Sequence, residues 1–110
     1  EEKFFDIIID DGSHKLSDIL VSLNIFFKNL RPGGFYIVEE FKYPNFFDHL
    51  NDCKEIKFDE LLVNLKEKRT FNSNIISQNN INYMLKNIKN IYEYYGLVKY
   101  SDIVFIEKLN

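Results

Sequence analysis

The spacing of apolar residues changes along the first forty positions of the chain. Phe4 to Ile9 form a nearly continuous apolar run rich in isoleucine, a pattern typical of a parallel strand covered on both faces. From Leu16 to Leu30 apolar residues recur at helical spacing with polar residues mostly opposite, which predicts an amphipathic helix. Phe35 to Val38 predict a second strand, which ends in Glu39 and Glu40. The order of strand, helix and strand predicts a right-handed parallel crossover.

A turn-like segment, Arg31-Pro32-Gly33-Gly34, separates the predicted helix from the second strand. Proline cannot continue a helix, and glycine accepts the left-handed geometry of a helix C-cap. We therefore interpret this segment as the end of the helix. Its two glycines match neither the dinucleotide nor the P-loop pattern, so they do not indicate a phosphate site.

The second half of the chain shows weaker patterns. A helix is predicted within Asn45 to Lys68, where apolar residues recur at helical spacing. Thr70 to Asn82 is polar and rich in asparagine and is predicted as a loop, with a short helix near Ile81 to Leu85 left open. Ile88 to Tyr95 and Ile103 to Ile106 predict an antiparallel pair of strands. The predicted fold class is α/β, with parallel strands, a crossover helix and a terminal antiparallel hairpin.

Composition narrows the classes of function. The chain of 110 residues is 45% hydrophobic, enough for the core of one domain. A net charge of −3 argues against binding to a nucleic-acid backbone, and no apolar run approaches the length of a membrane helix. The single cysteine, Cys53, cannot form an internal disulfide, so we expect a structural thiol and a cytoplasmic protein.

Four carboxylates follow the two predicted parallel strands. Asp10 and Asp11 follow the first strand, and Glu39 and Glu40 end the second. Neighbouring strands lie about 4.8 Å apart, so these side chains should converge and repel one another unless a cation intervenes. Oxygen ligands favour a hard divalent cation such as magnesium, calcium or manganese. His14 would lie beside that metal, within reach of a substrate proton.

Each of these residues also has a simpler interpretation. Asp-Gly is common turn chemistry, Ser13 suits a helix N-cap, and a histidine near a helix start is often an ordinary surface residue. Glu39 and Glu40 alone would usually be solvated charges. Acidic residues at the ends of two successive strands, with His14 between them, favour a common site over these separate interpretations.

The stretches "IDDGSH", "LRPGG" and "FYIVEE" together resemble the class I S-adenosylmethionine-dependent methyltransferases. Within that class the chain is similar to the metal-dependent branch that includes macrolide-sugar O-methyltransferases and cephalosporin hydroxylase-like proteins. The final stretch "IYEYYGLVKYSDIVFIEK" resembles the terminal hairpin of the family more loosely. The family typically has Glu-Asp where this chain has Glu39-Glu40, a departure that keeps the carboxylate but changes its reach.

The resemblance implies a role for each candidate residue. Asp11, Glu39 and Glu40 correspond to the magnesium ligands, and His14 corresponds to the proposed general base. Asp10 matches an acidic position that we expect to contact the cofactor or to support a ligand. The implied cofactors are S-adenosylmethionine and Mg²⁺ or another hard divalent cation. The implied substrate is a small molecule with a hydroxyl, such as a sugar or a related natural product.

The resemblance also implies that residues 1–110 are a partial domain. In this family the Gly-rich cofactor loop precedes the equivalent of Phe4, so the chain resembles the C-terminal half of a methyltransferase. The first strand would then expose an apolar edge that needs the N-terminal half or another chain. Two alternatives stay open: a non-catalytic half-domain with a structural or oligomerisation role, and a member with hydroxylase-like activity.

Overall fold

One mixed four-stranded sheet organises the computed structural model, which describes residues 3–110. Its strands are β1 (Phe5–Asp10), β2 (Leu30–Glu39), β3 (Ile88–Tyr95) and β4 (Asp102–Lys108). They lie in the order β1-β2-β4-β3, with β1 parallel to β2 and the other neighbours antiparallel. The predicted parallel crossover and terminal hairpin are confirmed, with β4 lying between β2 and β3.

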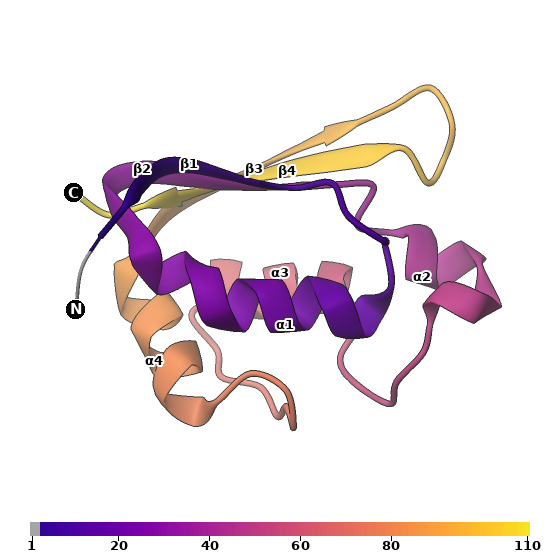
Figure 1. Cartoon of the computed structure of the whole chain (residues 1–110), viewed down its shortest axis with the longest axis horizontal. Coiled ribbons are helices and arrows are strands. Elements are labelled where there is room, and N and C mark those ends of the chain that lie inside the picture. The colour runs from indigo at the N-terminus through magenta and orange to yellow at the C-terminus, as the bar shows by residue number, and fades with distance from the viewer. Residues whose placement is uncertain (1–2) are drawn as a thin grey trace.

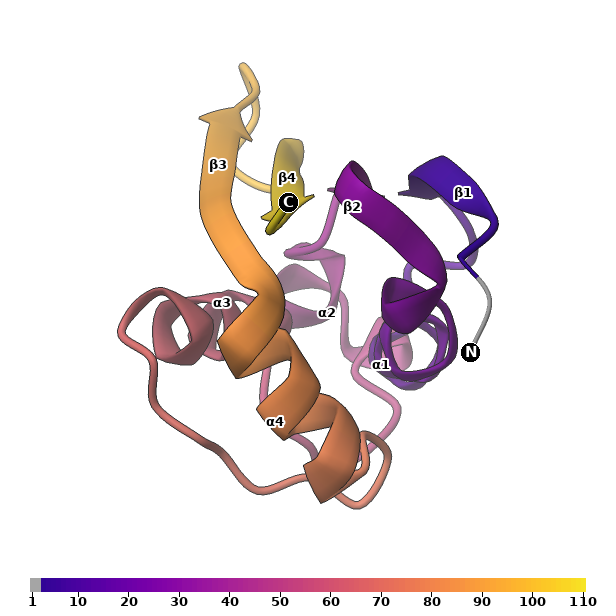
Figure 2. The ribbon, with the colours of Figure 1, turned by 90° about the vertical axis from the view of Figure 1, so that its left-hand side faces the viewer.

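The helices of the described chain pack against one face of this sheet (Figures 1 and 2). They are α1 (Leu16–Phe26), α2 (Tyr43–Phe46), α3 (Phe58–Lys66) and α4 (Gln78–Asn87), with short 3₁₀ turns η1 (Phe27–Asn29) and η2 (Asp48–Leu50). The helix predicted within Asn45 to Lys68 is therefore confirmed as α3. Within residues 3–110, no helix has both the length and the apolar character that a membrane span requires.

The core lies between the sheet and the helices. Tyr36 and Val38 of β2, with Val104 and Ile106 of β4, are buried on the helix side because alternate residues of a strand face the same side. The opposite face of β1 is open, with Ile7 57% and Ile9 58% exposed. The prediction that β1 is covered on both faces is therefore wrong for the described residues, whose helices all lie on one side.

The segment Arg31-Pro32-Gly33-Gly34 does not cap the helix as predicted. Helix α1 already ends at Phe26, and the η1 turn leads to Leu30, which is extended with φ −69° and ψ 140°. The four residues lie inside β2, where the register with β1 shifts. The local features that favour a helix end also suit an irregular strand.

Glycine is needed at both positions of this segment, for different steric reasons. Gly33 adopts the left-handed region with φ 84°, which glycine enters without the Cβ penalty of other residues. A Cβ on Gly34 would lie 2.6 Å from the carbonyl oxygen of Asp6, so only glycine lets the β1 backbone approach this closely. Both glycines therefore serve the β1–β2 pairing rather than a helix cap.

The predicted loop is confirmed for residues 70–77, but helix α4 begins at Gln78 and extends beyond the short helix left open near Ile81 to Leu85. Ser77 caps it by accepting a hydrogen bond from the backbone N–H of Asn80 at 3.2 Å. The Asn80 side chain donates to Asn24 Oδ1 at 2.7 Å, a contact across 56 positions of the chain. Tertiary hydrogen bonds of this kind override the weak helix propensity of asparagine.

Candidate functional site

The turns after β1 and β2 meet at one edge of the sheet. Asp10 pairs with Val38 across the two parallel strands, so the residues that follow each strand start from neighbouring positions. The chain after Asp10 turns into α1, and Glu40 follows β2 directly. The carboxyl edge of a parallel pair is where α/β folds place their ligands.

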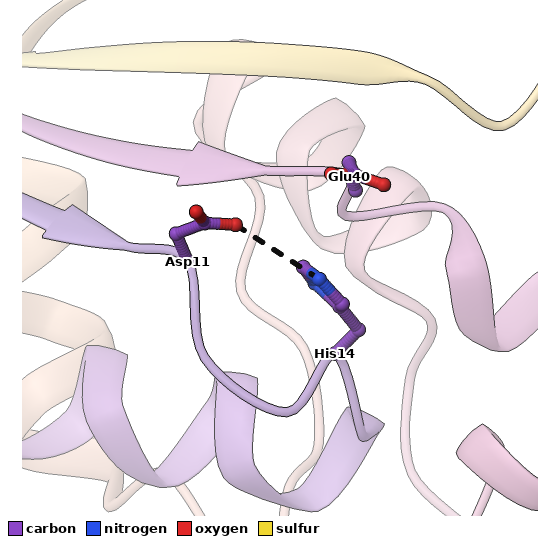
Figure 3. A group of neighbouring side chains, drawn as sticks. All are labelled: Asp11, His14 and Glu40. Carbon is purple, nitrogen blue, oxygen red and sulfur yellow. Dashed lines mark ion pairs between the residues drawn. The ribbon is translucent and has the colours of Figure 1, made fainter.

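Asp11, His14 and Glu40 form a cluster at this edge (Figure 3). One ligand atom from each residue lies within 4.8 Å of the other two. His14 Nε2 lies 3.9 Å from Asp11 Oδ1, as the dashed line in Figure 3 marks. Carboxylate oxygens this close to one another could hold one hard divalent cation after small movements of the side chains.

The chemistry of the donors separates their roles. Magnesium prefers carboxylate and water oxygens to imidazole nitrogen. The carboxylates of Asp11 and Glu40 therefore fit such an ion, and His14 fits a position beside it, with a nitrogen available for a proton.

Two residues of the cluster have strained backbones. His14 has φ 65° and Glu40 has φ 56°, a region that residues with a Cβ seldom occupy. Such a conformation costs on the order of 1–3 kcal/mol and persists only where neighbouring contacts hold it. Strain of this kind gathers at functional sites. Two of the three non-glycine residues with positive φ in the described chain are these predicted site residues, and the third, Lys68, lies outside the cluster.

The turn before α1 holds His14 through its neighbours. Ser13 Oγ accepts a hydrogen bond from the backbone N–H of Lys15 at 3.2 Å and donates to Asp18 Oδ2 at 2.5 Å. Ser13 is therefore not the N-cap of α1; that position belongs to Lys15. The imidazole of His14 packs on the ring of Tyr43, with ring centroids 4.7 Å apart.

Tyr43 is a site residue that the sequence did not reveal. Its phenol donates a hydrogen bond to the Glu40 carboxylate, and this bond raises the pKa of the phenol to about 12. Its backbone N–H also donates to the Glu40 carbonyl at 3.2 Å. Its position three residues after Glu40 was the available indication, but the nearby aromatic residues Phe41, Phe46 and Phe47 obscured it.

Glu39 and Asp10 lie outside this cluster. Glu39 is the last residue of β2 and pairs with Ile103. Because Val38 is buried toward the helices, strand alternation directs Glu39 to the opposite face. The structure thus brings together three of the five predicted site residues, and a ligand role for Glu39 stays a prediction.

Asp10 lines a cavity of about 370 Å³ beside the cluster, together with Tyr36. Its Oδ1 accepts from the backbone N–H of Gly12 at 3.2 Å. Asp10 Oδ2 and the Tyr36 hydroxyl are buried without a hydrogen-bond partner among the described residues. Burial raises the pKa of both groups, and the charge of Asp10 adds to the rise for Tyr36. Unpaired polar atoms beside a cavity fit a donor-bearing ligand such as an ammonium group, which suits the cofactor contact predicted for Asp10.

Comparison with curated proteins places the similarity in a short region. No family model matches the chain. The chain is 50% identical over 36 residues to L-olivosyl-oleandolide 3-O-methyltransferase of Streptomyces antibioticus, and 47% identical over 36 residues to demethylmacrocin O-methyltransferase of Streptomyces fradiae. Each match covers 33% of this chain and 9% of the relative.

Comparison with solved structures extends over nearly the whole fold. The methyltransferase MycE of mycinamycin biosynthesis, in complex with Mg, SAH and mycinamycin VI, superposes with a TM-score of 0.67 at 23% identity. A second MycE structure, with Mg and SAH, gives a TM-score of 0.62 at 26% identity. The matches cover 96% of this chain and 25% and 27% of those chains, so the chain spans about a quarter of their length.

The buried carboxyl of Asp10 predicts an unusual pH dependence of stability. A carboxyl whose pKa is raised in the folded state stabilises the fold below its unfolded pKa, and this contribution is lost as the pH rises through the folded pKa. We therefore expect Asp10→Asn to have a larger free energy of unfolding than the unsubstituted chain at pH 7. The difference should vanish near pH 3, below the ordinary aspartate pKa of about 3.9.

Urea denaturation at the two pH values measures this difference. Asp48→Asn, at an exposed position, is the matched control and should show no such gain. A variant at Asp10 that is no more stable than the unsubstituted chain at pH 7 would contradict the account of this carboxyl.

Three observations agree on a methyltransferase fold. The strand order and the single covered face match part of a solved methyltransferase. The acidic residues and the histidine lie at the edge of the sheet where α/β folds place their ligands. The named curated matches are O-methyltransferases. The chain therefore has the fold of part of a methyltransferase, and over about a third of its length it is similar to O-methyltransferases.

Proposed function

We propose that the protein containing this chain is a magnesium-dependent O-methyltransferase. It transfers the methyl group of S-adenosylmethionine to a hydroxyl of a sugar or a related small natural product. The observation that carries the proposal is the cluster of Asp11, His14 and Glu40 at the carboxyl edge of β1 and β2. The named relatives, which are O-methyltransferases of glycosylated antibiotics, support the hydroxyl as the acceptor.

The acidic residues of the site have different roles in this proposal. Asp11 and Glu40 would hold Mg²⁺, with Glu39 as a further predicted ligand, and Asp10 would contact the cofactor beside its cavity. Bound there, Mg²⁺ would orient the substrate hydroxyl and lower its pKa. Incomplete protein ligation leaves positions for water and substrate.

His14 acts as the general base in this proposal. The imidazole would take the proton of the substrate hydroxyl. S-adenosylmethionine would supply the methyl group for the hydroxyl oxygen, and its sulfonium would become a neutral thioether. The ring of Tyr43 packs on the imidazole and limits its rotation, so the nitrogen keeps its orientation toward the cluster.

The substitution His14→Ala in the full-length protein tests the base. We expect methyl transfer to fall at least about 100-fold, the lower end of what general-base catalysis contributes, while Mg²⁺ binding is kept. Turnover is measured with the full-length enzyme, and metal affinity is measured by calorimetry. His49→Ala changes an exposed histidine outside the cluster and serves as the control. Unchanged turnover in His14→Ala would remove His14 from the mechanism.

We further propose that residues 1–110 supply the metal and base half of the site, with the cradle of the cofactor elsewhere in the same fold. Two observations support this division. The chain spans about a quarter of the solved relatives, and β1 lies at the edge of the sheet with Phe5, Ile7 and Ile9 exposed. An apolar edge strand of this kind is suited to pair with a further strand, supplied by the N-terminal half or by another chain.

Calorimetric titration of S-adenosylmethionine into the 110-residue chain tests this division of the site. We expect no measurable binding, with or without Mg²⁺, because the chain has no Gly-rich loop to enclose the cofactor. Circular dichroism of the same sample confirms that the chain is folded. Clear saturable binding would show that these residues form the cofactor site unaided, and the half-domain proposal would fail.

A further inference from the structure

A partly buried ion pair connects the turn after β2 to the first residue of β4. Lys42 Nζ lies 3.0 Å from Asp102 Oδ2, and Asp102 is only 2% exposed. No hydrogen-bond donor is aligned on that oxygen, so charge rather than a directed hydrogen bond holds the pair. The Lys42 ammonium also lies 5.2 Å from the centre of the Tyr95 ring, which adds a cation–π contact.

The same aspartate holds Glu40 through its backbone. The Glu40 N–H donates to the Asp102 carbonyl at 2.6 Å, immediately beyond the last paired residues of β2 and β4. Glu40 lies there with φ 56°. The strained residue is thus held on one side by the Asp102 backbone, while Lys42, two positions later, is held by the Asp102 side chain.

Stability alone is a weak explanation for this pair. Removing two charges from water costs about as much as their attraction returns, so a buried ion pair seldom adds net stability over apolar side chains. A charged pair does fix where two chain segments lie relative to one another. Here those segments are the turn that carries Glu40 and the start of the strand beside it.

We propose that Lys42 and Asp102 are positioning residues, which hold Glu40 in its left-handed conformation so that its carboxylate meets the metal beside Asp11. The inference rests on the proposed function, because it assumes that Glu40 is a metal ligand. It assigns a role to two residues outside the family motif. Residues that orient metal ligands typically change metal affinity about 10- to 100-fold when substituted.

Substitution of Lys42 separates positioning from simple electrostatics. Substitution of Lys42 by an uncharged residue removes a positive charge near the proposed ligands Asp11 and Glu40. By Coulomb attraction alone, this change should strengthen the binding of any cation. If Lys42 holds Glu40 in position, its substitution should weaken cation binding instead. Magnesium demands near-ideal octahedral geometry whereas calcium tolerates irregular sites, so a displaced Glu40 should weaken Mg²⁺ binding more than Ca²⁺ binding.

The experiment titrates Mg²⁺ and Ca²⁺ into the full-length protein by calorimetry. We expect Lys42→Met to bind Mg²⁺ at least about 10-fold more weakly, with a smaller loss for Ca²⁺, and Lys42→Arg to restore most of the affinity. Lys66→Met breaks the ion pair with Glu93, away from the cluster, and is the matched control that should bind as the unsubstituted protein does. Asp102→Asn, which keeps the backbone carbonyl, should repeat the loss.

The outcomes distinguish this inference from the proposed function. If the unsubstituted protein binds Mg²⁺ and Lys42→Met binds it equally or more tightly, the positioning role is overturned while the metal site stands. If the unsubstituted protein binds no Mg²⁺, the metal site of the proposed function fails, and the inference fails with it. Circular dichroism verifies folding, and Asp102→Asn decides the matter if Lys42→Met does not fold.

Discussion

The parallel pairing of β1 with β2 is the constraint on which the site depends. Its register sets Asp10 opposite Val38, and the residues that follow each strand therefore meet at one edge. A slip of one residue would exchange the two faces of β1 and shift its carboxyl end relative to that of β2. The glycine backbone at Gly34 permits the close approach of β1, and the helices on one face hold the pair through the buried side of β2. The metal ligands and the base are thus positioned by strand register first and by their turns second.

The order of elements could be predicted from the sequence because hydrophobic spacing reports directly on which face of an element is buried. Boundaries depended on tertiary contacts that the sequence does not show. The sequence predicted a helix cap at Arg31 to Gly34, although these residues lie in β2, because proline and glycine suit both a cap and an irregular strand. The sequence left a short helix open near Ile81 to Leu85 but predicted a loop at the first turn of α4, because the partner that stabilises Asn80 is Asn24, far away in the chain.

The candidate site was predictable in composition but not in geometry. Two acidic strand ends and a histidine between them indicated the cluster. The sequence could not separate Glu40 from Glu39, because the distinction depends on the left-handed backbone of Glu40 and on its contact with Asp102. The sequence did not reveal Tyr43 for a similar reason, because its role depends on a ring contact with His14 and a hydrogen bond to Glu40. The contacts of Tyr43 and Asp102 hold His14 and Glu40 in their strained backbone conformations.

The central claim is that a hard divalent cation binds between the turns after β1 and β2. Anomalous diffraction at the manganese edge, from crystals of the chain grown with Mn²⁺, tests it most directly. We expect one ordered ion within bonding distance of a carboxylate oxygen of Asp11 and of Glu40, with the imidazole of His14 beside it. An ion bound elsewhere, or no ordered ion at this edge of the sheet, would contradict the account.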